Sequence, residues 1–136
     1  WARRPFRDAT HLHAELCATL RAAPQQRQLA LIRAHPDLAG RLARQKQLTA
    51  ESAREQASAG LDELNDAELA EFSRNNAAYS AKFGFPFVIC ARLNAKAPIL
   101  EAMRTRRGNS PDAEFTAALD EVEKIARLRL QDVLNA

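Results

Sequence analysis

Large residues recur three or four positions apart along most of this chain, and this spacing constrains the fold more than any other feature. It is clearest between positions 69 and 83, where the pattern predicts one buried face of an amphipathic helix. Asn65 and Glu68 match a capping box at its start, with Leu64 and Leu69 as the hydrophobic staple. The residues expected on the buried face are Leu69, Phe72, Asn76, Tyr79 and Phe83.

Cap and breaker residues divide the rest of the chain into further helices. We expect helices over residues 8–23, 24–36, 49–60, 98–108 and 110–134, and a short helical turn over 38–44. The segment of about residues 83–93 breaks the helical period, because Phe-Pro-Phe-Val-Ile-Cys is apolar without helical spacing. The prediction is one all-α domain over residues 1–136, a helical bundle with one buried extended segment.

Composition excludes several classes of protein. The chain has 136 residues, 46% apolar and 27% charged, which fits one globular domain and not a disordered chain. No apolar run reaches the roughly 20 residues of a membrane span, so we expect no membrane partner. A net charge of +3 is too small to indicate nucleic acid, and the basic cluster at 104–107 suits a helix C-terminus. Cys17 and Cys90 show no pairing pattern, so we expect free thiols and a cytoplasmic location.

Two polar residues stand where the pattern does not call for them. Arg129 falls within the apolar face of the last helix. It either reaches solvent from the edge of that face, pairs structurally with a carboxylate, or clamps an anion or carbonyl at the floor of a pocket. His35 stands at the end of the second helix and precedes Pro36, which holds it in an extended conformation, off the helix. It is either structural or, because histidine titrates near neutrality, a proton-transfer group.

Two further stretches allow both a structural and a functional interpretation. Ser52, Glu55 and Gln56 share one helix face among small residues, so they form either solvent-exposed surface or one wall of a polar pocket. The extended segment has backbone groups that need partners, either neighbouring side chains or strands, or a flat polar ligand. His13 and Cys17 are one turn apart without a third ligand, and we expect no metal site.

Together these stretches resemble the family of 2-oxo-4-hydroxy-4-carboxy-5-ureidoimidazoline (OHCU) decarboxylases. The similarity runs from Arg4-Pro5-Phe6 to the last helix, in the family's order, although family members usually have additional residues before the position of Trp1. The motifs that carry it are His35-Pro-Asp-Leu-Ala-Gly40, Ser52-x-x-Glu55-Gln56-x-x-Ala59-Gly60-Leu61, Phe83-Gly-Phe-Pro-Phe-Val-Ile89 and Lys124-Ile-x-x-Leu-Arg129-Leu.

The resemblance implies a homodimeric, cofactor-free carboxy-lyase of urate and purine breakdown that produces (S)-allantoin and CO2. Carried over by position, it makes His35 the catalytic acid/base and Glu55 and Arg129 the other catalytic residues. We further expect Glu55 to orient His35. The substrate-binding residues that it implies are Pro36, Ser52, Ala53, Arg54, Gln56, Phe87, Val88, Ile89, Cys90 and Ala91.

Two other classes compete with the enzyme. One is a catalytically inactive helical ligand-binding or interaction module on the same scaffold, which would be expected to have lost His35, Glu55 or Arg129, whereas all three are present. The other is a small DNA-binding helical domain, which would need an arginine-rich face interleaved with aromatic residues that the sequence lacks.

Overall fold

The computed structural model describes residues 8–40 and 46–134, and these form helices joined by loops without any strand. The helices are α1 (Ala9–Ala22), α2 (Gln25–Arg33), α4 (Ala50–Ser58), α5 (Asp66–Phe83), the short 3-10 helix η1 (Ala91–Leu93), α6 (Lys96–Arg106) and α7 (Pro111–Leu134). The all-α prediction is confirmed. The predicted turn over 38–44 extends beyond the described residues.

Several helix ends follow the predicted capping chemistry. Asn65 and Glu68 form both hydrogen bonds of the capping box at the start of α5. After α4, Gly60 adopts a left-handed conformation (φ 81°). Around it, the amides of Gly60 and Leu61 donate to the carbonyls of Ala57 and Gln56, the two bonds of a Schellman motif.

The start of α6 differs from the prediction that Pro98 opens the helix. The helix begins at Lys96, so Pro98 is its third residue. Proline is tolerated there because the first four N–H groups of a helix have no intrahelical partner. Similarly, α2 ends at Arg33, short of the predicted end at Pro36, because His35 lies before a proline that disfavours helical backbone.

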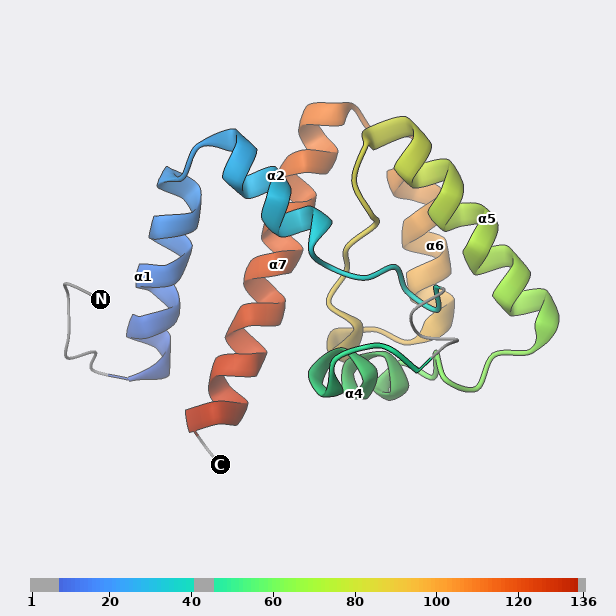
Figure 1. Ribbon diagram of the computed structural model, residues 1–136, viewed down its shortest axis with the longest axis horizontal. Coiled ribbons are helices and arrows are strands. Elements are labelled where there is room, and N and C mark those ends of the chain that lie inside the picture. The colour runs from blue at the N-terminus through green and yellow to red at the C-terminus, as the bar shows by residue number, and fades with distance from the viewer. Residues whose placement is uncertain (1–7, 41–45, 135–136) are drawn as a thin grey trace.

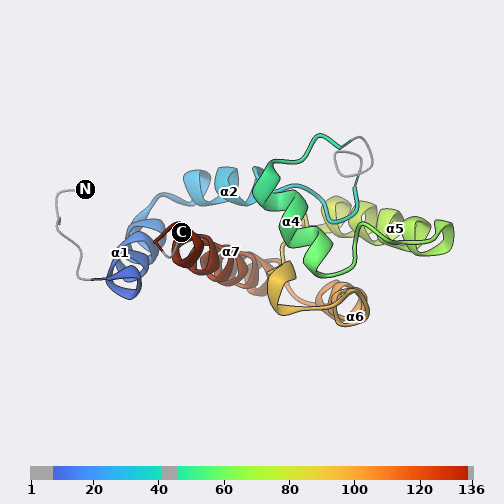
Figure 2. The ribbon, with the colours of Figure 1, turned by 90° about the horizontal axis from the view of Figure 1, so that it is seen from below.

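Helix α7 is the centre of the arrangement, with α1 and α2 packed against one side of it. Figure 1 shows the extended segment, residues 85–90, running between α7 and the pair α5 and α6. Helix α4 contacts η1 at the end of that segment, and Figure 2 shows α2 and α4 above α7. Residues distant in sequence, from α2, α4, η1 and α7, therefore meet around the extended segment.

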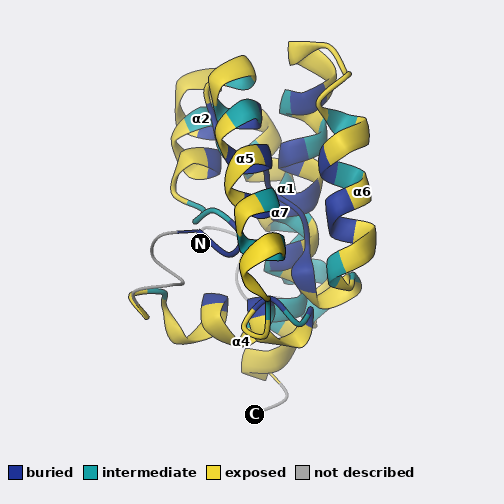
Figure 3. Cartoon of the chain, turned by 90° about the vertical axis from the view of Figure 1, so that its right-hand side faces the viewer, coloured by how far each residue is buried: buried dark blue, intermediate teal, exposed yellow. Residues whose placement is uncertain are grey.

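The core lies on the inward faces of α5, α6 and α7, as the buried colouring in Figure 3 shows. Tyr79 is at its centre, with its ring edge-on to Phe87 at 5.3 Å between centroids. Phe72, Ile99 and Met103 are fully buried around it. No helix among the described residues combines the length and the hydrophobicity that a membrane crossing requires.

Candidate active site

His35 lies just beyond α2, half-buried, with its ring fixed by the backbone. Its Nδ1 lies 2.9 Å from the carbonyl oxygen of Leu31. A carbonyl only accepts, so Nδ1 carries the proton and the lone pair of the neutral ring is on Nε2. Burial lowers the pKa of His35 below its ordinary value of 6.5, and the charge of Arg129 adds to this effect. The imidazole is therefore neutral at pH 7, with Nε2 able to accept a proton.

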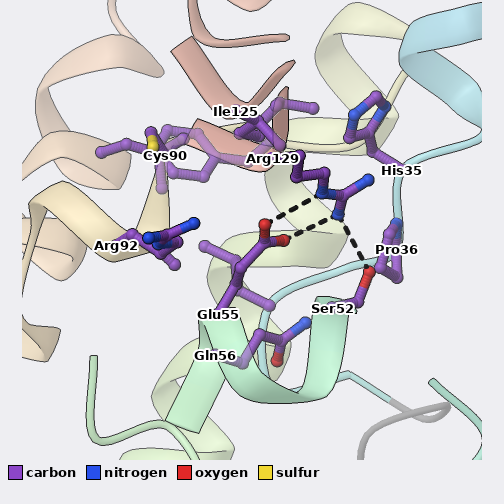
Figure 4. Close-up of a pocket in the computed structure, with 14 residues that line it drawn as sticks. His35, Pro36, Ser52, Glu55, Gln56, Cys90, Arg92, Ile125 and Arg129 are labelled. Atoms are coloured by element: carbon purple, nitrogen blue, oxygen red, sulfur yellow. Dashed lines mark hydrogen bonds and ion pairs between the residues drawn. The ribbon is translucent and has the colours of Figure 1, made fainter. Parts of the chain in front are cut away.

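Glu55 and Arg129 form a two-point ion pair between α4 and α7. The distances are 2.9 Å from Nε to Oε2 and 2.7 Å from Nη2 to Oε1, and Nη2 also lies 3.5 Å from the Ser52 hydroxyl. Figure 4 shows this pair beside His35. The carboxylate of Glu55 is thus committed to Arg129. The orientation of His35, which the sequence analysis assigned to Glu55, comes in this structure from the Leu31 carbonyl.

These groups surround a cavity of about 40 Å³. Its lining residues are His35, Pro36, Leu38, Ser52, Glu55, Gln56, Phe87, Val88, Ile89, Cys90, Ala91, Arg92, Ile125 and Arg129. The volume corresponds to little more than a water molecule, so a ring-sized ligand requires its walls to move or its ion pairs to rearrange.

The structure does not bring two of the expected binding residues to this cavity. Ala53 and Arg54 line a separate groove against the start of α5. The reason is helical geometry: successive residues are turned by about 100°, so Ser52, Glu55 and Gln56 share a face that the two residues between them cannot share.

Gln56 lines the cavity, but its amide is occupied by the loop that follows His35. Its Oε1 accepts from the Ala39 amide at 2.9 Å, and its Nε2 donates to the Asp37 carbonyl at 3.3 Å. From α5, Asn76 Nδ2 donates to the carbonyl of Leu38 at 2.9 Å. Three consecutive loop residues are thereby held by two buried side chains, which fixes the path of the backbone next to the imidazole.

Side chains also hold the extended segment from behind. Arg106 donates to the Val88 carbonyl at 2.8 Å, and the Cys90 amide donates to Glu121 Oε1 at 3.0 Å. Arg106 itself is paired with the fully buried Glu114 at 2.8 Å. The described structure gives no hydrogen-bond partner to the backbone amides of Val88 and Ile89. Both interpretations of this segment thus keep support: some groups are capped by side chains, and others stay available to a ligand.

Comparison with known protein families identifies the family of this chain. The sequence profile described as OHCU decarboxylase matches residues 1–131. The chain belongs to the OHCU decarboxylase family. It is 46% identical over 135 residues to the 2-oxo-4-hydroxy-4-carboxy-5-ureidoimidazoline decarboxylase of Amia calva, an alignment that covers 99% of this chain and 77% of that protein. It is 43% identical to the enzyme of that name from Mus musculus, covering 100% of this chain and 76% of the relative.

Other relatives extend the similarity to a bifunctional protein and to solved structures. The uric acid degradation bifunctional protein of Bacillus subtilis is 38% identical over 98% of this chain, which corresponds to 26% of its own length. A crystal structure of an OHCU decarboxylase in the presence of (S)-allantoin superposes with a TM-score of 0.72 at 27% identity, covering 91% of this chain and 82% of that one. A structure of (S)-allantoin synthase gives a TM-score of 0.72 at 31% identity, over 93% of this chain and 38% of that one.

Three cavity residues were absent from the sequence-based set: Leu38, Arg92 and Ile125. Ile125 is one helical turn before Arg129, so it shares the face of α7 that points to the cavity. Arg92 belongs to η1, which follows the extended segment, and Leu38 belongs to the loop after His35. The helical spacing could have found Ile125, whereas the other two depend on how the loops turn.

Proposed function

We propose that this chain decarboxylates OHCU to (S)-allantoin and CO2, without a cofactor, in urate degradation. The observation that carries the proposal is the cavity in which a neutral His35 with a free Nε2 adjoins the Glu55–Arg129 pair. Two comparisons support the proposal: the chain belongs to the OHCU decarboxylase family, and its fold is similar to that of an OHCU decarboxylase whose structure was determined in the presence of (S)-allantoin.

The substrate supplies its own electron sink. Its carboxylate and hydroxyl are both on C4, and the neighbouring C5 forms an imine-like bond to nitrogen. As the bond between C4 and the carboxylate breaks and CO2 leaves, its electron pair becomes a C4=C5 double bond. The pair of the C5=N double bond moves onto nitrogen, which takes up a proton from solvent. The resulting enol-like intermediate then loses the hydroxyl proton and gains a proton on C5.

His35 is the group proposed to take the hydroxyl proton. Its Nε2 is the basic nitrogen because Nδ1–H is engaged by Leu31, and its lowered pKa keeps it unprotonated at neutral pH. General acid–base catalysis of this kind typically contributes about 10²–10⁴-fold to the rate. Replacing His35 with Asn is therefore expected to lower kcat by at least about 10²-fold.

The remaining cavity groups are proposed to bind and shield the reacting ring. Arg129 and Ser52 offer hydrogen-bond donors, and the amides of Val88 and Ile89, which have no partner among the described residues, offer more. Glu55 holds Arg129 in place and balances its charge. Pro36, Phe87 and Ile125 provide apolar surface that excludes water from the intermediate.

The experiment is a coupled assay in which urate oxidase and hydroxyisourate hydrolase generate OHCU in the cuvette. Release of CO2 faster than spontaneous decay, lost in His35→Asn, is the expected result. A folded wild-type protein that leaves the spontaneous rate unchanged would refute the activity and favour a catalytically inactive binding module.

The homodimer and the cytoplasmic location belong to the same proposal. The free thiols Cys17 and Cys90 fit a reducing compartment. Sedimentation equilibrium tests the dimer, because a mass near 15.1 kDa at micromolar concentration would contradict it. Fractionation of the source cells tests the location.

A further inference from the structure

Arg92 is a charged cavity residue that neither the sequence analysis nor the mechanism above uses. It lies in η1 and lines the same cavity as Glu55 and Arg129. In the view of Figure 4, Glu55 lies between Arg92 and Arg129. The Arg92 guanidinium is bound to Asp132 of α7, with Nη1 2.5 Å from Oδ2 and Nη2 3.3 Å from Oδ1.

The charges around the cavity indicate that an anionic substrate needs a second cation besides Arg129. Glu55 and Arg129 neutralise each other, and His35 is uncharged at neutral pH. Among the described residues that line the cavity, Arg92 is the one remaining charged side chain. A substrate with a carboxylate brings a negative charge close to that of Glu55, which disfavours its binding unless another cation faces it.

The Asp132 carboxylate binds the Arg92 guanidinium in the way that a substrate carboxylate would. The planar fork of arginine binds a carboxylate at two points, and Asp132 occupies that fork. The Asp132 side chain is 59% exposed and that of Arg92 31%, so their ion pair is at the surface. Exposed ion pairs contribute little stability, so exchanging Asp132 for another carboxylate costs little.

We propose that Arg92 binds the C4 carboxylate of the substrate and exchanges Asp132 for it. This assignment rests on the proposed OHCU decarboxylase activity. Because the carboxylate leaves as CO2, its charge is present when substrate binds and is lost during the reaction. Arg92 thus stabilises the bound substrate more than the transition state, which affects KM and does not assist kcat.

The test compares Arg92→Gln with Asp132→Asn in the coupled assay. Both variants remove the same surface ion pair, but only the second leaves the guanidinium in place. Arg92→Gln is expected to raise KM about tenfold, from the loss of hydrogen bonds to a charged group, without lowering kcat. Asp132→Asn is expected to keep KM at or below the wild-type value, because Arg92 no longer has a competing partner.

Inhibition by (S)-allantoin provides the second readout. The product has lost the carboxylate, so its inhibition constant is expected to stay unchanged in Arg92→Gln. An unchanged KM in Arg92→Gln would overturn the assignment. An equal rise of KM in Arg92→Gln and Asp132→Asn would also overturn it. So would a rise in the inhibition constant of (S)-allantoin that matches the rise of KM in Arg92→Gln. Failure of the proposed activity is distinguishable, because in that case the wild-type protein itself does not accelerate decarboxylation.

Discussion

Arg129 and Glu55 are 74 residues apart in the sequence and meet through two hydrogen bonds, at 2.9 and 2.7 Å, that join α7 to α4. The pair lies beside His35, so the imidazole experiences one positive and one negative charge at once. Arg129 lowers the pKa of His35 and Glu55 raises it, while burial is the largest influence and lowers it. The charge state of His35 therefore depends on both partners of a pair that it does not itself join.

Breaking the pair from either side is expected to move the titration of His35 in opposite directions. Glu55→Gln leaves the positive charge of Arg129 uncompensated and lowers the pKa of His35 further. Arg129→Gln leaves Glu55 uncompensated and raises it. The measurement is an NMR titration of the imidazole protons, which the chain's three histidines and a His35→Asn control make assignable.

The same titration predicts a pH dependence of catalysis. The proposed base is the neutral imidazole, so kcat/KM is expected to be highest at neutral and higher pH and to fall as the pH drops through the lowered pKa of His35. The electrostatic account would be contradicted if Glu55→Gln and Arg129→Gln shifted the pKa of His35 in the same direction, or if neither variant shifted it.

Gln56 is expected to act on catalysis by positioning the loop after His35. Gln56→Ala leaves the buried Ala39 amide without its acceptor, which costs about 1–3 kcal/mol of stability and lowers kcat as the loop loosens. Gln56→Glu keeps an acceptor for this amide and is expected to restore part of the activity. Urea denaturation and steady-state kinetics measure the two effects.

Gln28 provides a matched control for that variant. It is also a buried glutamine and donates to the Leu20 carbonyl at 2.9 Å, but it does not line the cavity. Gln28→Ala is expected to reduce stability with kcat unchanged. If Gln28→Ala lowered kcat as much as Gln56→Ala does for the same loss in the free energy of unfolding, Gln56 would have only a structural role.

Glu114 is expected to be the most sensitive carboxylate for stability. It is fully buried and accepts from the Tyr79 hydroxyl at 2.5 Å, from Arg106 Nε at 2.8 Å and from Asn109 Nδ2 at 2.9 Å. Glu114→Ala leaves the charge of Arg106 largely buried without its partner, at a cost of about 3–5 kcal/mol in the free energy of unfolding.

Urea denaturation compares this variant with Glu101→Ala, which removes one exposed partner of Arg104. Glu101→Ala is expected to leave the free energy of unfolding nearly unchanged. If Glu114→Ala fails to fold, Glu114→Gln retains an acceptor oxygen and gives a smaller measurable loss. A loss for Glu114→Gln no larger than that for Glu101→Ala would contradict the role of the buried network.

The sequence predicted most of the helices because their ends depend on local chemistry. The Asn65–Glu68 capping box and the Gly60 terminus are decided within a few residues, and both are confirmed. The shared face of Ser52, Glu55 and Gln56 likewise follows from helical geometry. The same geometry places Ala53 and Arg54 along another groove, so their separation from the cavity was predictable.

Long-range partners could not be predicted from the sequence. Nothing local indicates that Arg129 meets Glu55, or that Gln56 uses its amide to hold residues 37–39. The basic cluster at 104–107 ends α6, as its sequence predicts. The sequence did not indicate that Arg106 also turns inward to Glu114 and supports the extended segment. These outcomes depend on how helices pack against distant elements, which the spacing of residues within one helix does not encode.

The optical activity of the product tests the central claim most directly. With OHCU generated in situ, spontaneous decay gives racemic allantoin and no lasting circular dichroism. Catalysis in a cavity that protonates C5 on one face is expected to give a persistent signal of the sign of (S)-allantoin, which disappears in His35→Asn. A folded wild-type protein that gives only racemic product, or a His35→Asn variant that matches it, would contradict the account.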